Sequence, residues 1–231
     1  MKHTNYYKPE NVEYFKAALD AARSEIKAGA ALRVCISDKN AKMGAVASVS
    51  TLPFITCPAR CAHSCGAYCY AAKIARLRKN VLQAYAKNTA LLLDKPGVFW
   101  AQVESAIMGL RFFRFNVSGD MINADYFKNV AEIAARQSHC KILIFTKRYE
   151  IVNAYIENGG TIPENLQVVF SGWENLKPIN PHGLPESNVI MPGADIPADW
   201  KTCGGNCFEC FCRGVGCWEL KPGETIAFRL H

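Results

Sequence analysis

Apolar positions in the first part of the chain follow the period of a helix. In residues 10–29 they recur every three or four positions, which predicts an amphipathic helix buried through Val12, Phe15, Leu19, Ala22 and Ile26. Two short apolar runs, 32–36 and 45–49, predict strands. Residues 70–93 predict one long helix with basic residues on one side.

From residue 111 onward, apolar runs alternate with helical patterns. Strands are predicted at 111–120, 141–148, 166–173 and 188–193, and helices at 122–137 and 149–160. The strands are almost continuously apolar, which is typical of parallel strands covered on both faces. Their alternation with helices indicates βαβ units, so the pattern predicts an α/β fold.

The overall composition limits the classes of protein to be considered. With 231 residues, of which 50% are hydrophobic and 20% charged, the chain can form one folded domain or a domain with a small appendage. No apolar run reaches the roughly 18–20 residues of a membrane helix. The amino terminus lacks the apolar stretch of a secretory signal, so we expect a reducing cytoplasm. The net charge of +7 suits a nucleic acid or a phosphorylated substrate but specifies neither.

Nine of the eleven cysteines fall into two short segments. The first cysteine group is Cys57, Cys61, Cys65 and Cys69, and the second segment holds Cys203, Cys207, Cys210, Cys212 and Cys217. In a reducing compartment, such spacing indicates metal ligands, with disulfides as the alternative. Cys35 and Cys140 stand alone among apolar neighbours and are predicted to be buried.

The spacing of these cysteines favours iron–sulfur over zinc. Zinc sites usually pair two Cys-x2-Cys units, whereas the first group steps by four residues throughout. Short, uneven loops can wrap the separated irons of a cubane cluster. A single helix would place Cys57 and Cys69 about 18 Å apart, so a shared cluster requires a loop there. Pro58 and Gly66 fit such a loop. Zinc remains the alternative.

Polar residues gather where the predicted strands end. They are Asn116, Ser118, Gly119, Asp120, Thr146, Lys147, Arg148, Ser171, Gly172 and Trp173, followed by Met191, Pro192 and Gly193 after the last strand. Chemistry in parallel α/β folds gathers at this edge, and the first cysteine group opens onto it. Lys147 and Arg148 could bind a carboxylate or a phosphate. The alternative is that these are ordinary loop residues.

A cysteine loop behind an early strand and ahead of βα units resembles the radical S-adenosylmethionine superfamily. The resemblance implies a partial (β/α) barrel over 1–200, with 201–231 as a cluster-binding segment packed on it. It assigns Cys61, Cys65 and Cys69 to a [4Fe–4S] cluster, with Cys57 as an alternative or extra ligand. Tyr68 stands where that superfamily has an aromatic residue before its last cysteine.

The same resemblance implies roles for the strand-end residues. Asp120 would hold the methionyl ammonium of S-adenosylmethionine, flanked by Asn116, Ser118 and Gly119. Lys147 would be a second catalytic residue, and Ser171 would lie in the cofactor site. Trp173 would stack on the adenine or a substrate ring, or else belong to the core. An auxiliary cluster is implied at Cys203, Cys207, Cys210 and Cys217.

The cysteine spacing departs from the superfamily in one respect. Its Cys-x3-Cys-x2-Cys pattern occurs at Cys203, Cys207 and Cys210, whereas the first group has three residues in every interval. Either the variant spacing is tolerated or cysteines of both groups meet around one cluster. Whether Cys212, His63 or His231 also bind metal stays open.

The segments CPARC, CGAYCYA, NVSGD, FTKR and FSGW, with the last cysteine segment, are similar to small uncharacterised radical-SAM-like proteins of phages and prophages. The resemblance covers most of 50–231. It implies reductive cleavage of S-adenosylmethionine and an electron donor such as flavodoxin or ferredoxin. It does not specify the substrate, small molecule or macromolecule.

Two other classes fit some of the same residues. A cluster-dependent enzyme without radicals, performing sulfur transfer or a lyase reaction, would keep the cluster and the strand-end site. A metal-stapled nucleic-acid-binding protein would use the net charge and the cluster of Arg76, Arg78 and Lys79. The basic residues do not form one stripe, which speaks against that class.

Overall fold

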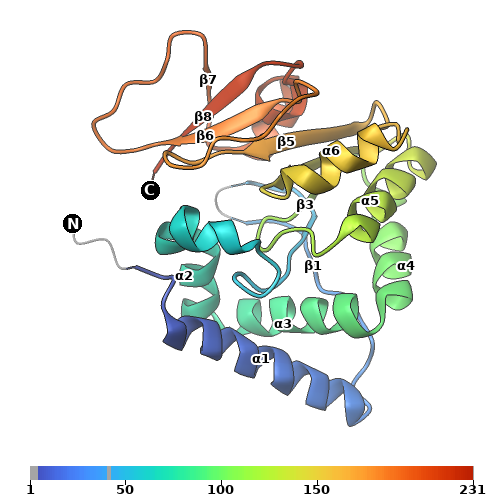
Figure 1. Ribbon diagram of the computed structural model, residues 1–231. Helices are drawn as coiled ribbons and strands as arrows, with labels where there is room; N and C mark the ends of the chain where they lie inside the picture. The colour runs from blue at the N-terminus through green and yellow to red at the C-terminus, as the bar shows by residue number, and fades with distance from the viewer. Residues whose placement is uncertain (1–4, 41–42, 231) are drawn as a thin grey trace.

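A computed structural model describes residues 5–40 and 43–230 of the chain (Figure 1). His231, left open above as a metal ligand, lies outside the described residues. The helices are α1 (Pro9–Lys27), α2 (Tyr70–Leu77), α3 (Lys79–Asp94), α4 (Pro96–Ile107), α5 (Ala124–Arg136), α6 (Tyr149–Glu157) and α7 (Cys207–Cys212), with 3-10 turns η1 (Ala59–His63), η2 (Cys65–Tyr68) and η3 (Gly216–Glu219). The strands are β1 (Ile36–Ser37), β2 (Ser48–Val49), β3 (Phe112–Phe115), β4 (Lys141–Thr146), β5 (Leu166–Ser171), β6 (Glu186–Ile190), β7 (Lys201–Thr202) and β8 (Thr225–Arg229).

One eight-stranded sheet organises the molecule, in the order β1-β2-β3-β4-β5-β6-β8-β7. Only β1 is antiparallel to its neighbour; every other pair is parallel. From β2 to β6 the parallel strands follow chain order, so these connections advance in one direction, as in a barrel, whereas β8 is inserted between β6 and β7. β1 and β7 end the sheet without pairing to each other, so the sheet is open. The predicted α/β fold with a partial barrel of parallel strands is confirmed.

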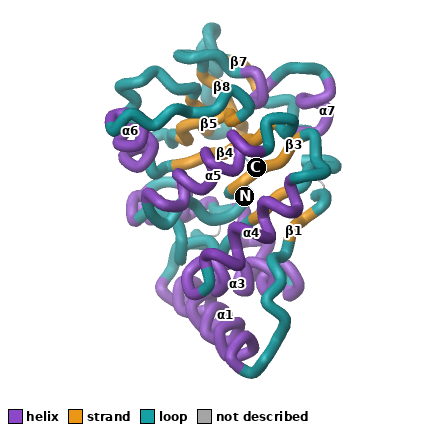
Figure 2. The backbone as a smooth tube through the Cα atoms, turned by 90° about the vertical axis from the view of Figure 1, so that its right-hand side faces the viewer, coloured by secondary structure: helices purple, strands orange, loops and turns teal. Residues whose placement is uncertain are grey.

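The two faces of the sheet are covered by different parts of the chain (Figures 1 and 2). Helices α4, α5 and α6 pack against alternate strand residues such as Phe113, Ile144 and Phe170. The residues between these, including Leu143 and Val169, pack against Trp218 of η3. Both side-chain sets are therefore buried, which explains the nearly continuous apolar pattern of β4 and β5.

Helices α1, α2 and α3 form a second, smaller core next to the sheet. The single long helix predicted over 70–93 is wrong, because Arg78 is extended (φ −127°, ψ 101°) and separates α2 from α3. Ala75 of α2 and Ala86 of α3 both lie in the core that contains Phe15 of α1.

The predictions for the two isolated cysteines have different outcomes. Cys140 is fully buried as predicted, but Cys35 is only half-buried. Residues 201–231 contribute β7, β8, α7 and η3, and β8 lies between β6 and β7. None of the helices in the described residues has the length and apolar character needed to cross a membrane.

Candidate functional site

The first cysteine group lies beyond the carboxyl end of β2. Parallel pairing brings the carboxyl ends of β2, β3, β4 and β5 to this same edge of the sheet. The segment is not one helix. The short 3-10 turns η1 and η2 meet at Ser64, whose backbone (φ −130°, ψ −106°) redirects the chain. This compact double turn is the loop that a shared metal site requires.

The thiols of the first group converge. Hydrogen bonds with Cys57 and Cys65 raise the pKa of the Cys61 thiol, and the bond with Cys61 lowers the pKa of Cys65. Burial raises the pKa of Cys69 to about 12, with the charges of Cys57 and Cys65 adding to the effect. The backbone N–H of Ala72 donates to Cys69 Sγ over 3.4 Å. All four thiols are free of disulfides, as are the other seven cysteines.

Asp120 ties the end of β3 to the end of β4. Its Oδ1 accepts from Thr146 Oγ1 (2.7 Å) and Met121 N (2.8 Å), and its Oδ2 accepts from Lys147 N (2.8 Å). The side chain is 5% exposed. Burial raises the pKa of this carboxyl, while the three hydrogen bonds lower it. The contacts show Asp120 holding the β4 end in place beside the first cysteine group.

Gly119 allows the loop after β3 to pack closely against the segment after β2. Its φ is +78°, and a β-carbon there would collide with the hydroxyls of Thr51 and Thr56. Those two hydroxyls are hydrogen-bonded to each other (2.9 Å), and Thr56 Oγ1 also accepts from Asp120 N (3.2 Å). The glycine therefore lets the β2 and β3 ends approach closely.

We expect Gly119→Ala to lower the free energy of unfolding by about 2–4 kcal/mol, because left-handed backbone strain and a buried clash add together. Gly193→Ala is the matched control, since Gly193 also has a positive φ (+86°) but open space around it. The control should lose only about 1 kcal/mol. Urea denaturation measures both, and equal losses would show that the close approach at Gly119 is not present.

Lys147 brings a buried cation to the first cysteine group. The side chain is 8% exposed, and its Nζ donates to Ser171 Oγ over 2.5 Å. Its charge lowers the pKa of Cys65 and also acts on Asp120. Tyr149 lies beside the same thiols and donates its hydroxyl to the Ser171 carbonyl. Thus Asp120, Lys147 and Ser171, predicted from three separate strand ends, are side by side.

Two side chains at this edge keep unsatisfied polar atoms. Asn116 has a left-handed backbone (φ +54°) and is 7% exposed. Its Oδ1 accepts from Tyr126 Oη (2.8 Å), while its buried Nδ2 has no partner. Arg148 likewise has a buried Nε without a partner. Ser118, by contrast, is used by the fold, because its Oγ donates to the Thr51 carbonyl (2.8 Å).

The segment after β5 closes over the first cysteine group. Trp173 is half-buried, and its ring centroid lies 5.9 Å from that of Tyr68. Asn175 Nδ2 donates to the His63 carbonyl over 2.6 Å. The His63 residue is exposed. Trp173 therefore belongs to the wall of the site and not to either large hydrophobic core.

The cysteines of the second segment lie on the sheet face that packs against Trp218, opposite the face covered by α4, α5 and α6. Four of them, Cys203, Cys207, Cys210 and Cys217, act electrostatically on one another and form the second cysteine group. Cys212 is exposed and lines a groove with Arg111 and His139. Gly205 N donates to Cys203 Sγ over 3.4 Å. The predicted auxiliary set thus comes together without Cys212.

The two cysteine groups are separate in space. The thiols of Cys61, Cys65 and Cys69 interact with one another, with the ends of β3 and β4, and with Tyr85 and Tyr149. The thiols of Cys210 and Cys217 interact with Cys203 and Cys207, with Arg114 of β3 and with Arg213. In Figure 1, α2, which follows the first group, and the orange α7, which carries the second, lie in different parts of the molecule. The alternative of one cluster shared by both groups does not fit this arrangement.

Arg114 contacts the second cysteine group, although its place in the sequence did not mark it as a site residue. Its Nη1 lies 3.3 Å from Cys207 Sγ and 3.3 Å from Met43 Sδ. A charged residue inside the apolar run RFFRF is the signal that could have pointed to it. Tyr149 was also missed, because only the fold brings α6 to the first cysteine group.

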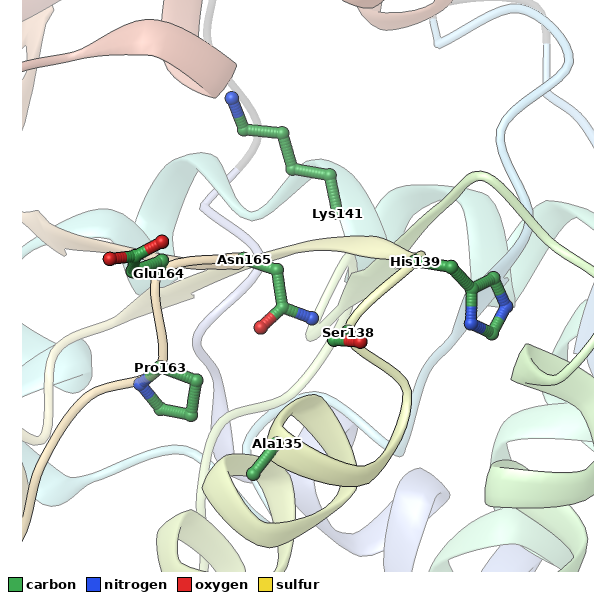
Figure 3. Close-up of a pocket in the computed structure, with 7 residues that line it drawn as sticks. All are labelled: Ala135, Ser138, His139, Lys141, Pro163, Glu164 and Asn165. Atoms are coloured by element: carbon green, nitrogen blue, oxygen red, sulfur yellow. The ribbon is translucent and has the colours of Figure 1, made fainter.

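Two further findings concern ligands. Among residues 5–40 and 43–230, no group of three or more His, Cys, Asp and Glu side chains is arranged as a site for a single metal ion. The hollow drawn in Figure 3 lies at the amino ends of β4 and β5, away from the strand-end site, and is lined by His139, Lys141 and Glu164. In this hollow, Asn165 Nδ2 donates hydrogen bonds to the carbonyls of Ala134, Gln137 and Cys140.

A family model described as gene product 88 matches residues 16–212. This chain belongs to the gene product 88 family. The match confirms the resemblance to phage-type proteins, and the finer likeness to the radical S-adenosylmethionine superfamily stays a prediction. The family match contains the whole first cysteine group and ends at Cys212, before Cys217 and β8. No curated protein and no solved structure matches the chain.

Proposed function

We propose that this member of the gene product 88 family is an iron–sulfur enzyme, with a [4Fe–4S] cluster at the first cysteine group. The observation that carries the proposal is the convergence of the free thiols of Cys57, Cys61 and Cys65, with Cys69 beside them. They converge at the carboxyl edge of a parallel sheet, where α/β enzymes place their chemistry. We place the protein in the cytoplasm, where thiols stay reduced.

The donor set and its surroundings suit a cluster. Thiolates are the usual ligands of [4Fe–4S] clusters, and N–H groups directed at the sulfurs tune them. Ala72 N supplies such a bond to Cys69. The buried Lys147 ammonium partly balances the negative charge of a thiolate cluster. We propose the second cysteine group as the site of an auxiliary cluster.

We further propose that S-adenosylmethionine binds at the same edge. A cluster held by three of the four cysteines would supply an electron and leave one iron open for that cofactor. Asp120 holds the β4 end so that Lys147 and Arg148 keep their positions. The unpartnered Nδ2 of Asn116 is available to donate to a cofactor carboxylate, and Trp173 forms an aromatic wall. The electron donor would be a flavodoxin- or ferredoxin-like protein; the substrate class stays open.

The test is a metal and sulfide analysis of protein purified without oxygen. We expect about four irons with matching sulfide for each occupied cluster, so up to about eight per chain. Reduction with added S-adenosylmethionine should then yield 5′-deoxyadenosine. Iron and sulfide without that product would support a cluster enzyme of the sulfur-transfer or lyase class instead. Zinc without sulfide would contradict the iron–sulfur proposal and favour a metal-stapled nucleic-acid-binding protein, whose affinity should fall steeply with salt.

A further inference from the structure

We propose that a groove between α7 and the amino ends of β3 and β4 binds one nucleotide of a single-stranded nucleic acid. The groove has a volume of about 640 Å³, which is within the range of small-ligand sites. Arg111, Phe112 and His139 line it from the sheet, and Phe208 and Phe211 line it from α7. None of the eight cysteines of the two groups lines it, so the inference does not depend on the proposed function.

The groove lies at the opposite edge of the sheet from the strand-end site. Arg111 directly precedes β3 and Lys141 begins β4, whereas the strand-end residues follow the carboxyl ends of these strands. The six residues of β4 separate its two ends by about 17 Å. The groove is therefore a second binding site and not an extension of the first.

Three aromatic rings line the groove. The Phe112 ring centroid lies 4.1 Å from that of Phe211 and 5.9 Å from that of Phe208. Phe112 and Phe211 are half-buried, while Phe208 keeps 38% of its surface exposed. A ring that is held by its neighbours and still exposed is the kind of surface on which an unpaired base stacks. Because the bases of a duplex are already stacked on one another, the rings favour a single strand.

Basic side chains line the same groove. The Arg111 guanidinium lies 5.8 Å from the Phe211 ring centroid, and within the described residues it forms no ion pair. Stacking on the ring orients the guanidinium and leaves its N–H donors able to bind a phosphate. His139 is exposed in the groove as well. Glu219, which also lines the groove, is paired with Lys141, so its negative charge is balanced.

A base next to a phosphate is the repeating unit of a nucleic acid, and the groove has a partner for each. Aromatic rings with nearby cations are typical of proteins that bind single strands. An acidic peptide would satisfy Arg111 but would leave the exposed Phe208 ring without a stacking partner. The net charge of +7 attracts a polyanion beyond the groove itself, which favours a strand over a free nucleotide.

The test is fluorescence anisotropy on the full-length reduced protein. The probe is a labelled oligothymidylate of about 20 nucleotides, longer than a typical single-strand site. We expect Phe208→Ala to weaken binding about 5–100-fold, the effect of losing one stacked base. Arg111→Met should weaken binding and reduce the slope of log affinity against log salt concentration by about one, the effect of losing one phosphate contact.

Tyr14→Ala and Arg33→Met are the matched controls. Tyr14 is 39% exposed and also has an arginine over its ring, Arg76 at 5.3 Å, but it lies on α1. Arg33 is exposed and lies outside the groove. Both controls should bind the probe like the parent protein. Circular dichroism checks that each variant is folded.

Four results would overturn the inference. They are an absence of probe binding by the parent protein, equal affinities of the groove variants and their controls, equal binding of the duplex formed with oligoadenylate, and full competition by thymidine monophosphate at the same nucleotide concentration. The last result would assign the groove to a free nucleotide. Because no variant changes a cysteine, iron and sulfide analysis tests the proposed function separately.

Discussion

Truncation of Trp218 to alanine should lower the free energy of unfolding by about 3–5 kcal/mol, the usual range for a large aromatic side chain lost from a core. Trp218 is 1% exposed and contacts Phe112 and Phe211, with ring centroids 6.0 and 5.5 Å away. Its Nε1 donates to the Cys207 carbonyl over 2.9 Å. The indole therefore joins the sheet to the segment that carries the second cysteine group.

The same substitution should also expose the second cysteine group. Once the indole is gone, the Cys207 carbonyl loses its hydrogen-bond donor and Phe211 of α7 loses one of its ring contacts. Alkylation of the reduced protein, followed by peptide mass spectrometry, should show faster labelling of Cys207 and Cys217. Denaturant unfolding under the same reducing conditions gives the stability change.

Trp100→Ala is the control for this experiment. Trp100 is 8% exposed in the core on the other face of the sheet, against Phe99 and Tyr126. It should lose a comparable free energy of unfolding without selective labelling of the second cysteine group. If both tryptophan variants label the same cysteines at the same rates, Trp218 does not hold that group.

The alternation of apolar runs and helices was enough to predict the central fold. The predicted strands at 141–148 and 166–173 correspond to β4 and β5, and the predicted helix at 122–137 to α5. These elements have strong local patterns because each buries whole faces against neighbours. The break at Arg78 could not be predicted, because no glycine or proline marks it. For α4 no helix was predicted.

The candidate site was predictable in its members but not in its contacts. Chain order alone placed the first cysteine group and Lys147 at one edge, since parallel strands end together. The side chains of Arg114 and Tyr149 carry no local signal of the thiols that they approach, because those cysteines are at least 80 residues away in the sequence. Asp120 was singled out by its position, yet its contacts are with the end of β4.

Because the two cysteine groups are separate, replacing cysteines of one group should strongly change the iron content of the protein. If each group holds its own cluster, replacing Cys61 and Cys65 with alanine should remove the iron of the first site, about half of the total. Replacing Cys207 and Cys217 should remove the other half. The reason is geometric, because the first group lies beyond the strand ends and the second lies on the sheet face next to Arg114.

Iron and acid-labile sulfide per chain, measured after anaerobic purification, decide the matter. Cys212→Ser and Cys35→Ser are matched controls, because Cys212 is exposed outside the gathered second group and Cys35 belongs to neither group. Both should keep the full iron content. Loss of all iron in both paired variants, with the controls intact, would mean that the two groups serve one cluster, against the arrangement in the structure. Retention of all iron in either pair would exclude those two cysteines as ligands.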